Sequence, residues 1–118
     1  MNDNSLRDND MTEVSMIIIM NAGDARLIIK EALDYVAGCD FEMAKEKLTE
    51  AKKKITAAHS AQTETIQGEA RGEKVVFSLL FAHAQDTLMT IMSEWNTANH
   101  IVRLFEVYDQ RLRKLEER

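Results

Sequence analysis

Apolar residues recur at three- and four-residue steps along most of the chain, and this spacing predicts helices rather than strands. A first helix is predicted to start near Asp10 or Thr12, either of which is a plausible N-cap, and Gly38 is positioned to close it. Residues 1–10 are polar and are predicted to form a flexible tail, with one domain over residues 11–118. The inward-facing positions of the first helix are Val14, Ile17, Ile18, Asn21, Ala25, Ile28, Ala32 and Tyr35.

A second helix is predicted for residues 41–67, with Asp40 as its N-cap and Gly68 at its end. Its apolar positions are Phe41, Ala44, Leu48, Ala51, Ile55 and Ala58. This stripe is narrow and rich in alanine, which predicts tight packing on one side and water on the other. Gly23, inside the first helix, indicates either close approach of a neighbouring segment or simple tolerance of a glycine there.

The third predicted helix is the longest, because residues 73–118 contain neither glycine nor proline. At about 1.5 Å per residue it approaches about 65 Å, against about 40 Å for each of the other two. One apolar side consists of Phe77, Phe81, Leu88, Trp95 and Val102, and a second of Val76, Leu79, Leu80, Ile101, Leu104 and Tyr108. The sequence therefore predicts an all-α fold, an antiparallel three-helix bundle with a surplus apolar face that favours self-association.

Composition supports a helical, cytoplasmic protein of one domain. The 118 residues include no proline and four glycines, and the net charge of −5 argues against a binder of nucleic acid or anionic membranes. The apolar run of residues 14–20 is far shorter than the roughly 20 residues of a membrane span. Cys39 is the one cysteine, so no internal disulfide and no zinc site built from several thiolates is expected, and the thiol is predicted to be inert.

A compact polar patch interrupts the second apolar side of the third helix. His83 and Asp86 lie one turn apart there, accompanied by Thr87 and Thr90. The chain has no nucleophile-elbow serine, glycine-rich phosphate loop or helical zinc signature. A neutral imidazole is itself a nucleophile, so one histidine suffices for a phosphoryl relay, with hydroxyls as suitable donors around the phosphoryl oxygens.

Two roles are open to Asp86 on these grounds. It can orient the ring of His83 by accepting a hydrogen bond, or it can meet copies of itself on a symmetry axis, protonated or bridged by a hard cation such as Mg²⁺. The other two histidines, His59 and His100, are predicted to be structural or surface residues, and Trp95 to belong to the core.

Three blocks of sequence together carry a family resemblance. They are "IIIMNAGDARLIIKEAL", "GCDFEMAKEKLTEAKKKITAAHSAQTETIQGEA" and "SLLFAHAQDTLMTIM", in that order over most of the chain. In these blocks the chain resembles the enzyme IIA components of the lactose/cellobiose family of the bacterial phosphoenolpyruvate-dependent sugar phosphotransferase system. The resemblance implies a three-helix protomer that assembles as a homotrimer.

The resemblance also implies a function and roles for individual residues. His83, the histidine of "HAQD", would accept phosphate from the phosphocarrier protein HPr and pass it to a cysteine of the cognate enzyme IIB. Asp86 would lie on the trimer axis, where family members can hold a divalent cation such as Mg²⁺. The alternative is a non-catalytic helical adaptor or regulator that keeps the IIA fold.

One position departs from the family pattern, which commonly continues "HAQDHLM". This chain has Thr87 where the second histidine would stand, so it keeps a hydroxyl donor and loses an imidazole. Because His83 and Asp86 remain, the expectation is an active relay. The transported sugar is not encoded in these residues, since specificity in this system belongs mainly to the membrane component.

Overall fold

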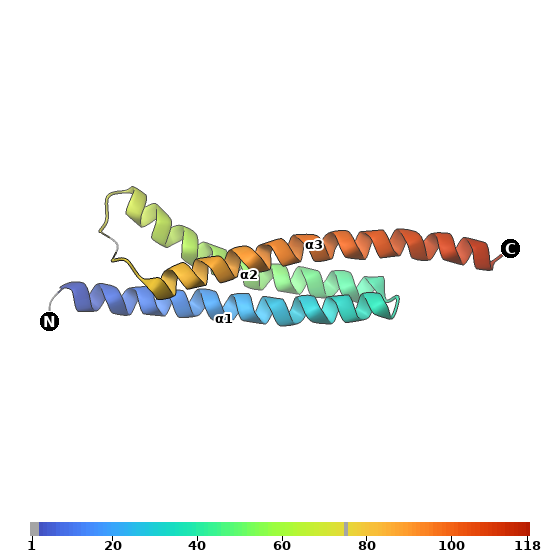
Figure 1. Ribbon diagram of the computed structural model, residues 1–118, viewed down its shortest axis with the longest axis horizontal. Helices are drawn as coiled ribbons and strands as arrows, with labels where there is room; N and C mark the ends of the chain where they lie inside the picture. Colours follow the sequence, from blue (N-terminus) through green and yellow to red (C-terminus); the bar gives the residue numbers. More distant parts are fainter. Residues whose placement is uncertain (1–2, 75) are drawn as a thin grey trace.

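Three long helices account for most of the chain that the structure describes (Figure 1). The computed structural model describes the backbone of residues 3–74 and 76–118 and the side chains from Asp10 onward, residue 75 excepted. Helix α1 spans Asp3–Ala37, α2 spans Phe41–Ala70 and α3 spans Leu79–Glu116. The described residues contain no strand, which confirms the predicted all-helical fold.

Helix α1 begins earlier than the sequence predicted, at Asp3 rather than near Asp10 or Thr12. Residues 1 and 2 lie outside the described residues, and the flexibility expected of residues 1–10 stays a prediction. The buried positions of α1 are Met11, Ser15, Ile18, Ala22, Ala25, Ile29, Ala32 and Val36. The inward stripe is therefore turned slightly from the predicted one, and Ile17 is exposed. A side chain added at Gly23 would meet nothing within 4 Å, so within the protomer this glycine is simply tolerated.

Both α1 and α2 end in the same hydrogen-bonding motif. After α1, the amide of Cys39 donates to the carbonyl of Val36 and that of Asp40 donates to the carbonyl of Tyr35. After α2, the amides of Gly72 and Glu73 make the corresponding two bonds. The motif requires a left-handed residue, which is a glycine at one end (Gly72, φ 90°) and Cys39 (φ 62°) at the other. Gly38 was predicted to close α1, and the left-handed position falls one residue later.

The start of α2 was predicted correctly and the start of α3 was not. Asp40 caps α2, because its carboxylate accepts a hydrogen bond from the amide of Met43 at 3.2 Å. Helix α3 begins at Leu79 instead of Glu73, and Ser78 caps it by accepting from the amide of Phe81 at 3.1 Å. Val76 and Phe77 carry side chains that favour extended backbone, and Ser78 itself is extended, so the absence of glycine and proline does not continue the helix here.

Helix α2 runs back along α1 and also lies against α3. Two ion pairs show the opposite chain directions of the two helices. Lys47 of α2 pairs with Glu31 of α1, and Lys54, further along α2, pairs with Asp24, which is earlier in α1. The alanine-rich stripe of α2 is buried as predicted, and Leu88, Ile91, Ala98 and Val102 of α3 close the core. Over the described residues, none of the three helices combines the length and apolar character that crossing a membrane requires.

The side of α3 turned away from this core follows an eleven-residue repeat. We call it the outward stripe, and it comprises Asp86, Thr90, Ser93, Thr97, Ile101, Leu104, Tyr108, Leu112 and Leu115. All of them are exposed except Ile101, which is partly buried. The C-terminal end of α3 continues past the α1–α2 turn, so that neither helix covers it there (Figure 1). The predicted surplus apolar face is confirmed as an exposed surface: Tyr108 is 56% and Leu115 60% exposed.

Candidate functional site

His83 is the fifth residue of α3 and lies in its second turn. The late start of α3, fixed by the Ser78 cap, is what brings the histidine so close to the helix N-terminus. The side chain is exposed and has no hydrogen-bond or ion-pair partner among the described residues. The imidazole is therefore accessible to another protein without any rearrangement of the fold.

Asp86 is also exposed and lies one turn further along α3, at the first position of the outward stripe. Among the described side chains it makes no hydrogen bond with His83, so the ring-orienting role is not seen in the single chain. An exposed carboxylate on the outward stripe is free to meet a second molecule. Of the two roles left open by the sequence, the geometry of the protomer is compatible with the one on a symmetry axis.

Thr87 and Thr90 are both bonded to their own helix. The Thr87 hydroxyl donates to the carbonyl of His83 at 2.9 Å, and the Thr90 hydroxyl donates to the carbonyl of Asp86 at 2.8 Å. The sequence indicated that these hydroxyls are suitable donors around phosphoryl oxygens, and this stays a prediction. In the chain without phosphate both hydroxyls donate to backbone carbonyls.

No cation stands near His83 on its own helix. From Leu79 to Val102 the sequence of α3 contains neither lysine nor arginine, and Arg103 is the first basic residue after the site. The nearest favourable charge on α3 is the partial positive charge of its N-terminus, where the first amides lack helical partners. On α3 itself, an anionic group on His83 would therefore be met by neutral donors and the helix dipole and by no cationic side chain.

Among the described residues, no hydrogen bond or ion pair links the other sequence candidates to His83 or Asp86. The Nδ1 atom of His59 lies 3.3 Å from the Thr63 hydroxyl, and Arg103 lies 3.0 Å from Nδ1 of His100. The indole of Trp95 donates to the carbonyl of Leu48 at 2.8 Å, joining α3 to α2. Cys39 is exposed in the α1–α2 turn.

Within one chain, the described His, Cys, Asp and Glu side chains form no group of three that could hold a metal ion. Asp86 contributes a single carboxylate to the surface. One carboxylate is too few for a hard cation, which takes six or more oxygen ligands, many of them from water. A cation at Asp86 would thus need oxygens from further copies of the chain.

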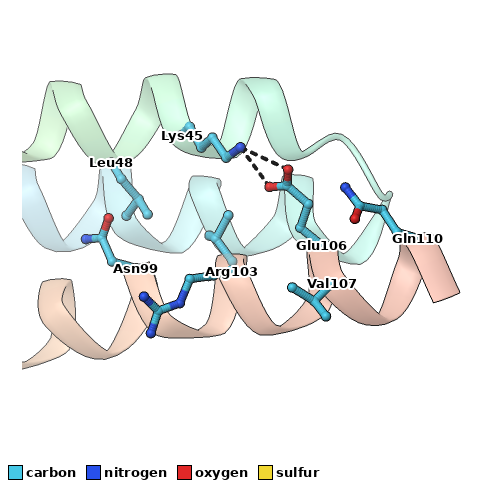
Figure 2. A pocket seen from close by; sticks show the side chains of 8 residues that line it. Lys45, Leu48, Asn99, Arg103, Glu106, Val107 and Gln110 are labelled. Atoms are coloured by element: carbon cyan, nitrogen blue, oxygen red, sulfur yellow. Dashed lines mark hydrogen bonds and ion pairs between the residues drawn. The ribbon is translucent and has the colours of Figure 1, made fainter.

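A groove of about 430 Å³ between α2 and α3 is separate from the histidine site (Figure 2). Leu48 and Val102 line it, and Lys45 bridges it to Glu106, with nitrogen–oxygen distances of 3.1 and 2.7 Å. The hydrogen bond with Glu106 raises the pKa of Lys45 above its ordinary 10.5. The α3 residues of the groove begin sixteen positions after His83, about 24 Å along the helix. The Lys45–Glu106 ion pair links α2 to α3 and is not part of the site at His83.

A family model, individual relatives and solved structures all connect the chain to the same family. The family described as "PTS system, Lactose/Cellobiose specific IIA subunit" matches residues 13–106. The lichenan-specific phosphotransferase enzyme IIA component of Bacillus subtilis is 39% identical over 97 residues, which cover 82% of this chain and 88% of that protein.

Two solved structures extend the likeness to three dimensions. The cellobiose-specific enzyme IIA of Bacillus anthracis superposes with a TM-score of 0.80 at 36% identity, covering 85% of this chain and 92% of that one. The IIA(chitobiose) structure from its complex with HPr, of the Escherichia coli phosphotransferase system, gives 0.73 at 34% identity, covering 84% and 96%. The chain therefore belongs to the lactose/cellobiose-specific IIA family of the phosphotransferase system, as its three sequence blocks predicted.

Proposed function

We propose that the protein is a phosphoryl relay in which His83 accepts phosphate from HPr and passes it to a cysteine of a cognate enzyme IIB. The observation that carries the proposal is the exposed, unpartnered imidazole of His83 near the start of α3. A relay must be reached by two different proteins in turn, and an exposed ring allows this while a buried ring would prevent it. Membership of a family in which the E. coli chitobiose relative forms a complex with HPr supports HPr as the donor.

The chemistry needs only one nucleophile. The lone pair of an unprotonated ring nitrogen of His83 forms a bond to phosphorus while the donor atom of HPr leaves with its own electron pair. In the second step a thiolate of enzyme IIB attacks phosphorus, and the ring nitrogen of His83 recovers its lone pair. The positive end of the α3 dipole, one turn away, favours the doubly negative phosphoryl group while it is held.

A homotrimer built around α3 is part of the same proposal. The outward stripe of α3 repeats every eleven residues, a spacing that keeps one face of a nearly straight helix turned to its neighbours. Its C-terminal part is apolar and exposed, and patches of this kind on a single chain indicate contact with another protein surface. Three copies of one stripe around a shared axis would cover it.

Asp86 would then supply one carboxylate from each of three copies to the axis. Three converging carboxylates repel unless they are protonated or bridged, and oxygen ligands suit a divalent cation such as Mg²⁺. The cation would offset most of this charge and hold the three helices in register. Asp86 would bind no phosphate itself, because a carboxylate is negatively charged and only accepts hydrogen bonds.

The test is phosphorylation by purified enzyme I, HPr and phosphoenolpyruvate. We expect an acid-labile label on the wild-type chain and none on His83→Ala, while His100→Ala keeps it because that histidine lies elsewhere on α3. An unlabelled wild type, or a label that survives His83→Ala, would contradict the proposal. Partner binding that ignores both phosphate and His83 would instead favour an adaptor with the IIA fold.

A further inference from the structure

The helix does not depend on the hydrogen bond that the Thr87 hydroxyl donates. The hydroxyl donates to the carbonyl of His83 at 2.9 Å. That carbonyl also lies inside α3, where it accepts the backbone amide of Thr87 as an ordinary step of the helix. Turning the hydroxyl elsewhere would leave no backbone group without a partner, so little free energy opposes it.

Thr87 is also within reach of a group carried by His83. Residues four apart on a helix have Cβ atoms about 5–6 Å apart, and threonine in a helix populates two rotamers. The next hydroxyl, Thr90, lies seven residues beyond His83, about 10 Å along the axis, and donates to a different carbonyl. Thr87 is the one hydroxyl of α3 within a turn of the histidine on its C-terminal side.

A phosphoryl group on His83 would find no cationic side chain close by on its own helix. Residues 79–102 of α3 contain no lysine or arginine, and Asp86 adds a negative charge one turn away. Like charges at this spacing are unfavourable. A neutral hydroxyl at Thr87 can offset part of that repulsion, because hydrogen bonds to ionised acceptors are stronger than those to a carbonyl.

We propose that the Thr87 hydroxyl turns from the carbonyl of His83 to a phosphoryl oxygen once the histidine is phosphorylated, and thereby stabilises the phosphohistidine. The inference rests on the proposed relay function and adds a residue to it. Thr87 donates a hydrogen bond and transfers no proton, so bond formation and cleavage at phosphorus are unchanged. In the free protein the same bond to the carbonyl keeps the hydroxyl satisfied until it is needed.

The experiment compares matched threonine variants in the phosphoryl exchange between HPr and the full chain. Thr87→Val keeps the shape and removes the donor, and Thr90→Val removes an equivalent bond one turn further on. With the equilibrium measured by ³¹P NMR, we expect Thr87→Val to shift it about tenfold toward phospho-HPr. Thr87→Ser and Thr90→Val should stay within about twofold of the wild type.

Helix propensity is controlled by Thr87→Ala, which favours the helix more than threonine does and should show the same shift as Thr87→Val. Wild-type exchange in Thr87→Val, or an equal shift in Thr90→Val, would overturn the inference while leaving the relay intact. A wild-type chain that takes no phosphate at all would overturn the relay itself, and the two failures are therefore distinguishable.

Discussion

The two halves of the outward stripe of α3 have opposite characters. The first half, from Asp86 to Thr97, is polar, and His83 lies just before it. The second half, from Ile101 to Leu115, is apolar, and its end has no helix of the same chain beside it. Both halves are exposed on one continuous helix, so the difference arises from side chains alone.

This contrast indicates a division of labour along one helix. Polar side chains near His83 are well hydrated when no other protein is bound, and such a surface suits transient binding of a partner. Exposed apolar side chains are unfavourable in water, so a surface of this kind favours a stable interface that buries it. We therefore expect the C-terminal half of the outward stripe to hold copies of the chain together. We expect the N-terminal half to lie beside the site where partner proteins bind.

The largest effect is expected from a charge placed in the apolar half. Leu112→Glu removes about 2 kcal/mol of apolar burial from each copy of the proposed trimer, before any cost of burying a carboxylate. We expect dissociation to monomers at micromolar concentration, measured by sedimentation velocity. The matched control is Gln110→Glu, which adds the same charge off the stripe and should leave the assembly unchanged. A trimer that survives Leu112→Glu would contradict this division.

The opposite outcome is expected for a change in the polar half. Asp86→Leu replaces converging charges by apolar contact and should leave the trimer intact or make it stronger. Thermal unfolding with and without a chelator should then become identical, because the variant has no carboxylate for a cation. If Asp86→Leu falls apart to monomers, the carboxylate and its cation are needed for assembly.

A smaller effect concerns the α1–α2 turn, which borders the C-terminal half of α3 at Asp109 and Arg113. Cys39 is left-handed with φ 62°, a conformation that costs a non-glycine residue about 1–2 kcal/mol. Cys39→Gly removes this cost but makes the unfolded chain more flexible, so we expect a net gain of about 0.5–1 kcal/mol. Denaturant unfolding measures the gain. Gly72→Ala is the reciprocal control and should destabilise, because Gly72 holds the same position after α2 with φ 90°.

The smallest effect is expected from alkaline pH. A folded-state pKa of Lys45 above 10.5 means that its pair with Glu106 stabilises the fold below that pH, and that this contribution is lost as pH rises through the higher value. Other groups titrate in the same range, so the comparison is with Glu106→Gln. Between pH 9 and pH 11.5 the wild type should lose more of its Tm than the variant does. Equal losses would mean that the pair contributes nothing measurable.

Much of this fold could be predicted from the spacing of apolar residues. The alanine stripe of α2 and its Asp40 cap follow from local pattern alone, and both are confirmed. The start of α3 was wrong because the absence of glycine and proline was taken as continued helix. The valines before Ser78 and the capping serine itself were the available signals.

The candidate site was predictable in part. The "HAQD" motif pointed to His83 and Asp86, whose roles stay predictions, and family membership is confirmed. The bonds of Thr87 and Thr90 to the backbone were not foreseen, because helical spacing places a hydroxyl on a face without deciding which acceptor it takes. The trimer and its cation stay predictions, since they depend on surfaces that only a second copy can complete.

The reach of α3 has a practical consequence. From His83 to Glu116 the helix rises about 50 Å, so the ring of His83 is separated from the C-terminal end of α3 by well over half the length of a molecule 76 Å long. A fluorophore or a surface linker joined at Arg118 would therefore stand clear of any protein docking at the histidine. Oriented immobilisation through this end would allow single encounters with HPr and enzyme IIB to be timed one after the other on the same molecule.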